Sequence, residues 1–278
     1  MPNREPVARR MFELTEPICL VNFFSEEPNE AMVALGLRDN YWDGYFAGRS
    51  APLGRVPAEV VHAAFYNFGE GEAARHIPRV WDVTTPEAAY AARQQGCVRA
   101  LRRILGDLVG TPGLARAAEL LAQASTSAPT NGRVMYAGLR TLPMPEETLT
   151  RLWHAANMLR EHRGDGHIVA LVSEGVGGTE SHVLSALDMG VYPAESFGRI
   201  HHLPKARLAQ VMDGLRDRGL LDASDHLTDA GRATKDRVES LTDALAEPPY
   251  DGLTAHELDE LVGSLEPIAA RLVETGSS

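Results

Sequence analysis

Apolar residues recur at intervals of three and four along most of the chain, which is the spacing of one face of an α-helix. No segment keeps the two-residue alternation of a half-buried strand for long. The helical pattern is found near residues 6–16, 27–36, 57–67, 85–105, 111–124, 145–163 and 166–174. The first two thirds of the chain are therefore predicted to be a series of helices.

Local residue chemistry indicates where several of these helices begin and end. Thr85-Pro86 and Thr111-Pro112 each place a capping side chain before a proline in the first helical turn, and Gly106 is a typical helix stop. Loops are expected at 125–132 and 142–145, where Ser, Thr, Pro and Gly gather.

The last third has a different order of elements. Helices are predicted at 180–190, 194–200 and 203–218, followed by two short strands around a polar tip within 220–228 and then a long helix. That order is typical of a winged helix. We therefore predict an all-α fold with a small β-wing, divided into a helical domain, 1–177, and a winged-helix subdomain with C-terminal helices, 178–278.

The composition is that of a globular protein, with 44% hydrophobic and 23% charged residues among 278. No apolar run reaches the roughly 18 residues that a transmembrane helix needs. The N-terminus lacks the apolar core of a secretory signal, so a cytoplasmic protein with no membrane partner is expected. Cys19 and Cys97 are far apart and are expected to be buried thiols.

Three segments of the last third resemble the MarR family of winged-helix regulators: 215–221, 227–232 and 253–258. The whole chain, including 45–49, 65–68 and 161–167, resembles a little-studied actinobacterial helix-turn-helix family. The resemblance implies a winged-helix fold and a homodimer formed through the C-terminal helices. An apolar stripe suits such a dimer: Leu258, Leu261, Leu265, Ile268 and Leu272.

The net charge argues against carrying over the regulator's DNA binding. The chain has a formal net charge of −11, and residues 191–278 hold 9 Lys and Arg against 16 Asp and Glu. Because cationic side chains supply most non-specific affinity for DNA, a DNA-binding face is expected to be basic. The predicted wing tip, 223–226, has no Lys or Arg. DNA binding is therefore not expected.

The densest group of polar residues on an apolar background lies at 152–168. Gly164 predicts a helix break that gathers titratable groups, with His167 or His162 as the acid/base group and Glu161 or Asp165 orienting it. Two arginines, Arg160 and Arg163, are expected to hold an anionic substrate.

The same segment has a purely structural interpretation, in which Gly164 stops one helix and Asp165 caps the next. Its histidines and carboxylates match no familiar metal-ligand spacing, so no metal site and no cofactor are predicted.

Two further patches, 41–49 and 65–68, hold aromatic residues that are either core or ligand-lining. Together with Trp153 and His154 of the 152–168 segment, they supply the other candidate substrate-binding residues: Tyr45, Arg49, Tyr66 and Asn67.

Two functions remain open from the sequence. One is a cofactor-independent acid/base enzyme of specialised metabolism, in which the winged helix is a scaffold that is not used for DNA. The other is a MarR-like, ligand-responsive transcriptional regulator or a ligand-sequestering protein. The clustered His, Arg and acidic residues favour the enzyme, and both interpretations require a small-molecule ligand.

Overall fold

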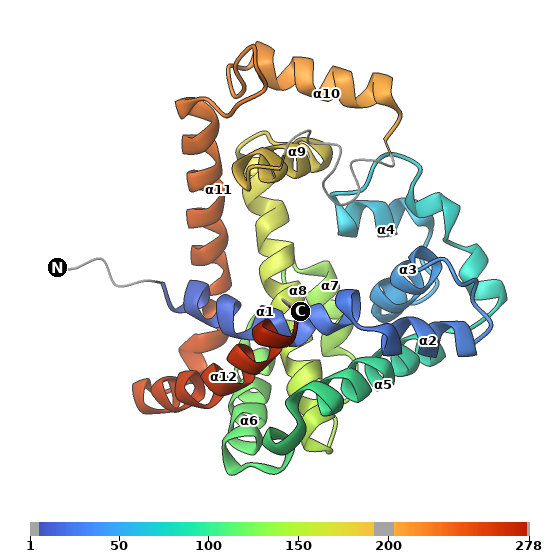
Figure 1. Ribbon diagram of the computed structural model, residues 1–278, viewed down its shortest axis with the longest axis vertical. Helices are drawn as coiled ribbons and strands as arrows, with labels where there is room; N and C mark the ends of the chain where they lie inside the picture. Colours follow the sequence, from blue (N-terminus) through green and yellow to red (C-terminus); the bar gives the residue numbers. More distant parts are fainter. Residues whose placement is uncertain (1–5, 192–202, 277–278) are drawn as a thin grey trace. The chain divides into compact units, whose positions relative to one another are not determined.

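The computed structural model describes residues 6–191 and 203–276, and nearly all of the secondary structure in them is helical (Figure 1). Its α-helices are α1 (Val7–Phe24), α2 (Glu26–Ala34), α3 (Trp42–Ser50), α4 (Ala58–Phe65), α5 (Pro86–Leu105), α6 (Pro112–Ser127), α7 (Val134–Arg140), α8 (Thr148–Ser173), α9 (Gly178–Asp188), α10 (Lys205–Asp217), α11 (Asp229–Ala246) and α12 (Ala255–Gly276). Short 3₁₀ helices lie at Ala51–Leu53, Ala73–Arg75, Arg79–Asp82, Gly106–Gly110 and Pro248–Gly252. The helix predicted at 194–200 lies outside the described residues.

The chain divides into two compact units, each made of separate stretches of sequence. Unit 1 holds residues 1–57, 76–165 and 243–278, and unit 2 holds residues 58–75 and 166–242. Helices α8 and α11 each contribute residues to both units. The domain boundary predicted between residues 177 and 178 stays a prediction.

The predicted helix starts of unit 1 are confirmed by their caps. The Thr85 hydroxyl accepts a hydrogen bond from the Ala88 amide at 3.2 Å, and Thr111 does the same for Leu114 at 3.3 Å. In both helices the following proline occupies the first turn, where no amide hydrogen is needed. Gly106 ends α5 with a positive φ of 51°, a conformation that glycine adopts at little cost.

Helices α2 and α5 pack closely because residue 96 has no side chain. A Cβ built on Gly96 would lie 2.5 Å from Pro28 Cα and 2.7 Å from the Glu27 carbonyl oxygen. Both are backbone atoms, which cannot move aside without shifting α2. Glycine at this position therefore sets the distance between the two helices.

The apolar stripe of the C-terminal helix is used inside unit 1. Helix α12 packs on α1 and α6, and Leu261, Leu265, Ile268 and Leu272 are at most 6% exposed. The stripe therefore completes the core of unit 1 within one chain. The homodimer through the C-terminal helices stays a prediction.

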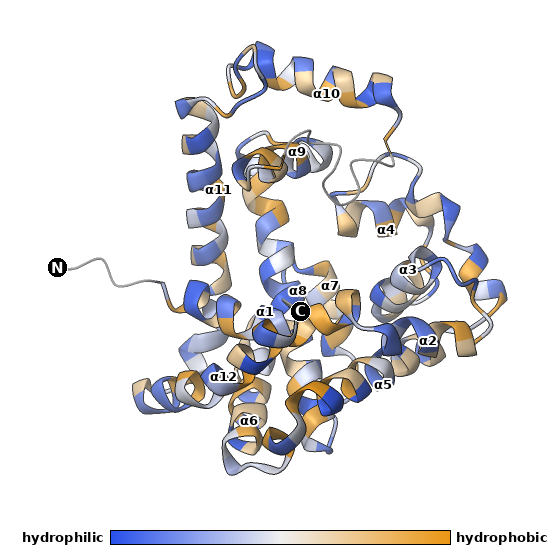
Figure 2. Cartoon of the chain, viewed as in Figure 1, coloured by the Kyte–Doolittle hydropathy of each residue, from blue (hydrophilic) through white to orange (hydrophobic). Residues whose placement is uncertain are grey.

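Unit 2 has a separate apolar core formed mainly by α9, α10, the end of α8 and α11. Its buried members are Ala170, Leu171, Val176, Val183, Leu184, Ala186, Leu187, Val211, Leu215, Leu220, Leu221, Leu227 and Val238. Figure 2 shows hydrophilic and hydrophobic residues mixed along α10 and α11, as expected of helices with one buried side. Among the described residues, no helix is both long enough and apolar enough to cross a membrane.

The two strands predicted within 220–228 do not form as strands. In the described part of the chain Leu221 and Leu227 make one isolated antiparallel bridge. The Asp222 carboxylate accepts the amides of Ser224 at 2.8 Å and His226 at 2.9 Å, which closes the turn directly after the bridge. Helix α10 ends at Asp217 and helix α11 begins at Asp229, so few residues are left for strands on either side of the turn.

The packing of α2 on α5 predicts opposite effects for one substitution at two helical glycines. Gly96→Ala should lower the free energy of unfolding by about 1–3 kcal/mol, because the added methyl group meets backbone atoms. Gly263→Ala is the matched control in α12, where an added Cβ meets no atom within 4 Å. It should raise stability by about 0.5–1 kcal/mol, the usual gain over glycine in a helix. Urea denaturation measures both, and equal effects at the two sites would contradict the close approach.

Candidate functional site

Helix α8 continues through the segment where the sequence predicted a break. Gly164 and Gly166 are both helical, so the separate helices expected at 145–163 and 166–174 are one helix, Thr148–Ser173. A glycine inside a helix costs only about 0.5–1 kcal/mol relative to alanine. That cost is small beside the packing of α8, in which every residue from 152 to 159 is at most 4% exposed.

The four candidate catalytic residues are consequently not gathered at one turn. Glu161, His162 and Asp165 belong to unit 1, whereas His167 belongs to unit 2. The His167 Nδ1 atom lies 3.0 Å from Thr242 Oγ1. The Thr242 hydroxyl donates to the Val238 carbonyl at 2.7 Å, so the imidazole N–H donates to the hydroxyl oxygen.

Asp165 caps a helix that is distant in sequence. Its two carboxylate oxygens accept the amides of Met135 at 3.3 Å and Tyr136 at 3.0 Å, in the first turn of α7. Burial raises the pKa of Asp165 to about 6, although the hydrogen bond from the Tyr136 amide acts in the opposite direction. The cap predicted for the helix that follows Asp165 in sequence is therefore wrong, because α8 is continuous there; Asp165 caps α7 instead.

His162 lies beside the same helix. Its ring meets Tyr136 edge-on, with ring centroids 5.0 Å apart. Burial and then the nearby charge of Arg133 lower the pKa of His162 to about 4, so the imidazole is neutral at physiological pH. Its Nδ1 atom has no hydrogen-bond partner among the described residues.

Glu161 forms a buried ion pair with Arg49. The Arg49 Nε and Nη2 atoms donate to the two carboxylate oxygens, each at 3.0 Å, and Nη1 donates to the Tyr45 hydroxyl at 2.9 Å. Burial alone would raise the pKa of Glu161, but the guanidinium of Arg49 lowers it to about 2. A carboxylate held this firmly in its charged form is a poor proton carrier near neutral pH.

A second pair, which is only partly buried, joins α8 to α1. Arg160 donates through Nε and Nη2 to the Glu16 carboxylate at 2.9 and 3.1 Å, and its guanidinium lies 5.3 Å from the centre of the Phe23 ring. Arg163 is also engaged within unit 1, by Asp243 at 2.7 Å. Both predicted anion-binding arginines therefore already have a carboxylate partner.

A third guanidinium of this region, that of Arg93 on α5, is 4% exposed and was not among the residues predicted from the sequence. Its Nε donates to Asn22 at 3.1 Å, Nη1 to the Gly48 carbonyl at 3.5 Å and Nη2 to Asn157 at 3.4 Å. The guanidinium carbon lies 5.5 Å from the centre of the Trp153 ring. Arg93 was missed because no other residue of α5 was a candidate site residue. The sequence feature that could have indicated it is a charged residue on the apolar side of that helix.

The remaining candidate in this region, His154, is tied to α5. Its Nδ1 atom lies 2.6 Å from the Tyr90 hydroxyl, and burial lowers the pKa of His154 to about 4. The structure thus brings together six of the predicted residues in one polar interior of unit 1: Tyr45, Arg49, Trp153, His154, Arg160 and Glu161. We call Glu16, Arg49, Arg93, Arg160 and Glu161 the charge cluster.

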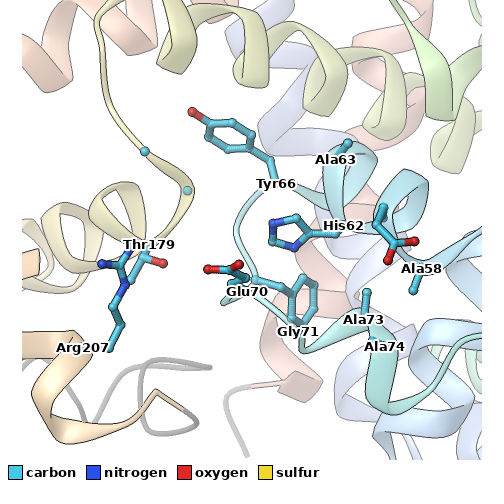
Figure 3. A pocket seen from close by; sticks show the side chains of 14 residues that line it. Ala58, His62, Ala63, Tyr66, Glu70, Gly71, Ala73, Ala74, Thr179 and Arg207 are labelled. Atoms are coloured by element: carbon cyan, nitrogen blue, oxygen red, sulfur yellow. The ribbon is translucent and has the colours of Figure 1, made fainter.

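Tyr66 and Asn67 lie in unit 2, where Tyr66 lines a pocket of about 870 Å³. Figure 3 shows His62, Tyr66 and Glu70 on one side of this pocket and Thr179 and Arg207 on the other. The Tyr66 hydroxyl donates to the Val176 carbonyl at 2.7 Å. His62 Nδ1 is shielded from solvent and has no hydrogen-bond partner within 6–191 and 203–276. The volume is within the range of small-molecule sites.

Across the described residues, no group of three or more His, Cys, Asp and Glu side chains is placed to hold a metal ion. Cys19 and Cys97 are buried free thiols, and burial raises the pKa of each well above its usual range.

A family model described as a helix-turn-helix family matches residues 8–278, which is nearly the whole chain. No curated protein and no solved structure matches the chain. The MarR-type wing and the actinobacterial source implied by the resemblance stay predictions.

The buried pair of Arg49 and Glu161 predicts a large stability loss on removing one partner. Glu161→Gln leaves the guanidinium without its charge partner, so the free energy of unfolding should fall by about 3–5 kcal/mol. Glu266→Gln is the matched control, since Glu266 pairs with Arg10 on the surface, where such pairs contribute at most about 1 kcal/mol. Urea denaturation at pH 7 separates the two; a loss below 1 kcal/mol for Glu161→Gln would contradict a buried pair.

The raised pKa of Asp165 predicts a pH-dependent difference between the wild type and Asp165→Asn. In the wild type the folded state binds the proton more tightly than the unfolded state. This carboxyl group therefore contributes most below its ordinary pKa, near 4, and loses that contribution as the pH rises through about 6. The asparagine variant lacks this loss. Its stability relative to wild type should increase between pH 4 and pH 7, and a difference that is flat across this range would show that Asp165 titrates normally.

Proposed function

The chain belongs to this helix-turn-helix family, and on that basis we propose that it is a ligand-responsive transcriptional regulator that reads duplex DNA with helix α10. The observation that carries the proposal is the exposed start of α10. Lys205, Arg207 and Gln210 are exposed there, while Val211 and Leu215 anchor the helix in the core of unit 2.

These exposed residues have the chemistry of base readers. In helix-turn-helix proteins the N-terminal residues of the second helix contact base edges in the major groove. An arginine side chain can form two hydrogen bonds with guanine, and a glutamine side chain can form two with adenine. The Arg207 Nη1 atom donates to Gln210 Oε1 at 3.2 Å, so the two side chains lie together on one side of the helix. No carboxylate of the described residues pairs with Arg207 or Lys205.

The distribution of charge between the units supports this surface. Residues 191–242 hold eight Lys and Arg and eight Asp and Glu, whereas residues 243–278 hold one Arg and eight acidic residues. The latter stretch belongs to unit 1. The net negative charge of residues 191–278 thus comes from residues 243–278, which lie outside unit 2. The rest of unit 2 carries one Arg and six acidic residues, so we expect modest affinity.

The proposed wing is the turn at 221–227, and it contributes little to DNA binding. Its tip carries Asp222 and Asp225, and Arg216 pairs with Asp225 at 2.5 Å. The turn itself has no Lys or Arg to contact phosphates, and the Asp222 carboxylate is repelled by them. Recognition is therefore assigned to α10 alone.

The ligand in this proposal occupies the pocket of unit 2. Arg207 lies both on the exposed start of α10 and in the lining of this pocket. Arg207 lines the pocket together with His62, Tyr66, Glu70 and Thr179 (Figure 3). A small molecule that binds the guanidinium there removes it from DNA. The acid/base enzyme favoured by the sequence lacks this kind of support, since its histidines lie in different units and its carboxylates are already engaged.

Selection from a pool of random DNA duplexes tests the proposal. One sequence class should be enriched, and Arg207→Ala and Gln210→Ala should each bind it about 5- to 150-fold more weakly, as expected from losing a base contact of 1–3 kcal/mol. Arg237→Ala is the control, because Arg237 lies on α11 and pairs with Glu174. Fluorescence anisotropy measures all three.

Salt dependence separates base from phosphate contacts in the same assay. Lys205→Ala should weaken binding to every duplex alike and make the slope of log affinity against log salt about one unit shallower. If no sequence is enriched, or if the Arg207 and Arg237 variants bind equally well, α10 does not read DNA.

A further inference from the structure

A small cavity lies beside the charge cluster in unit 1, where the end of α1 meets α2, α3 and α5. Its volume is about 50 Å³. Since a water molecule needs about 10–15 Å³ of such space, the cavity holds roughly three to five waters or an equally small organic group. Its lining includes Asn22, Phe23, Ser25, Tyr41, Tyr45 and Arg93.

Arg93 is a buried cation without a carboxylate partner among the described residues. It is 4% exposed, and its three acceptors are the Asn22 and Asn157 side chains and the Gly48 carbonyl. Two of these bonds are long, at 3.4 and 3.5 Å. A guanidinium has five N–H donors, so two of those on Arg93 remain for a ligand.

The two carboxylates of the charge cluster are held by the other two arginines. Glu161 accepts hydrogen bonds from Arg49, and Glu16 accepts them from Arg160. Neither carboxylate is therefore a hydrogen-bond partner of Arg93. Burying a cation without such a partner is costly, and an anion in the cavity would supply one.

Aromatic side chains contribute to the walls of the cavity. Phe23 and Tyr41 each pack against Tyr45, with ring centroids 5.9 and 6.2 Å apart. Ser25 and Tyr41 are both partly exposed, so the cavity is bordered by surface residues through which a short ligand can enter.

We propose that this cavity binds a small monocarboxylate of about four heavy atoms, such as acetate, with its carboxylate on the Arg93 guanidinium. The proposal is independent of DNA reading, because it rests only on residues of unit 1. Two hydrogen bonds from one guanidinium to one carboxylate are the geometry that arginine favours. The volume excludes larger groups from the interior of the site.

Binding is measured on the full chain by thermal unfolding and by ¹³C NMR line broadening of labelled acetate. At constant ionic strength, sodium acetate and formate should raise the unfolding temperature in a saturable way, while chloride should not. Labelled acetate should broaden on adding wild-type protein and sharpen on adding excess unlabelled formate. The absence of saturable binding of either carboxylate, or an equal response to chloride, overturns the proposal.

The substitution Asn22→Asp places a carboxylate of the protein itself in the cavity, where it competes with the ligand for Arg93. The change is isosteric and places a carboxylate oxygen near the Arg93 Nε atom, which now lies 3.1 Å from Asn22 Oδ1. Acetate affinity should fall at least about tenfold, a change of ~1.4 kcal/mol. Asn131→Asp is the matched control on an exposed turn, and it should bind acetate like the wild type.

Retained acetate binding in Asn22→Asp would show that the ligand does not use Arg93 and would overturn the assignment. If that variant does not fold, Ser25→Leu is the second variant, because it fills the cavity from its partly exposed side and leaves Arg93 unchanged. It should also lose acetate binding at least about tenfold, or ~1.4 kcal/mol, and unchanged binding would place the ligand elsewhere.

Discussion

Two guanidinium–carboxylate pairs, one buried and one partly buried, constrain the interior of unit 1. Removing a charged group from water costs several kcal/mol, and the cost is recovered only when a partner is held in good hydrogen-bonding geometry. Arg49 with Glu161 and Arg160 with Glu16 meet this condition with two bonds each. Because adjacent residues of α8 supply one member of each pair, α1, α3 and α8 have one mutual arrangement that leaves no charge unpaired.

The position of Arg93 follows from that arrangement. With α8 fixed, Asn157 and Trp153 face α5, and Arg93 lies against both. Neutral acceptors and an aromatic ring offset part of the desolvation of its guanidinium, but they supply no counter-charge. Arg93 is thus the guanidinium of the charge cluster whose hydrogen bonds, among the described residues, go to neutral acceptors alone, which is why we propose an anion in the neighbouring cavity.

Unit 2 distributes its polar groups in the opposite way. Its core is apolar, and its chemistry lies on the exposed start of α10 and in the pocket that shares Arg207. The net charge of residues 191–278 does not describe the exposed start of α10. It combines residues 191–242 of unit 2, which are neutral overall, with residues 243–278 of unit 1, which are strongly acidic. The net charge that DNA would meet therefore depends on which residues fold together.

The sequence by itself determined most of the helices and the residues that are chemically unusual. Thr85 and Thr111 cap helices through bonds to residues three positions away, and such local chemistry is readable in the chain. Only the tertiary structure decided the partners. Glu161 meets Arg49 across 112 residues, and α8 continues through Gly164 because its buried packing outweighs the cost of two glycines. The physical reason is the sequence separation of the interacting groups. A helix cap bonds to a residue within one turn, whereas the partner of a buried charge can come from a distant part of the chain that only folding brings close.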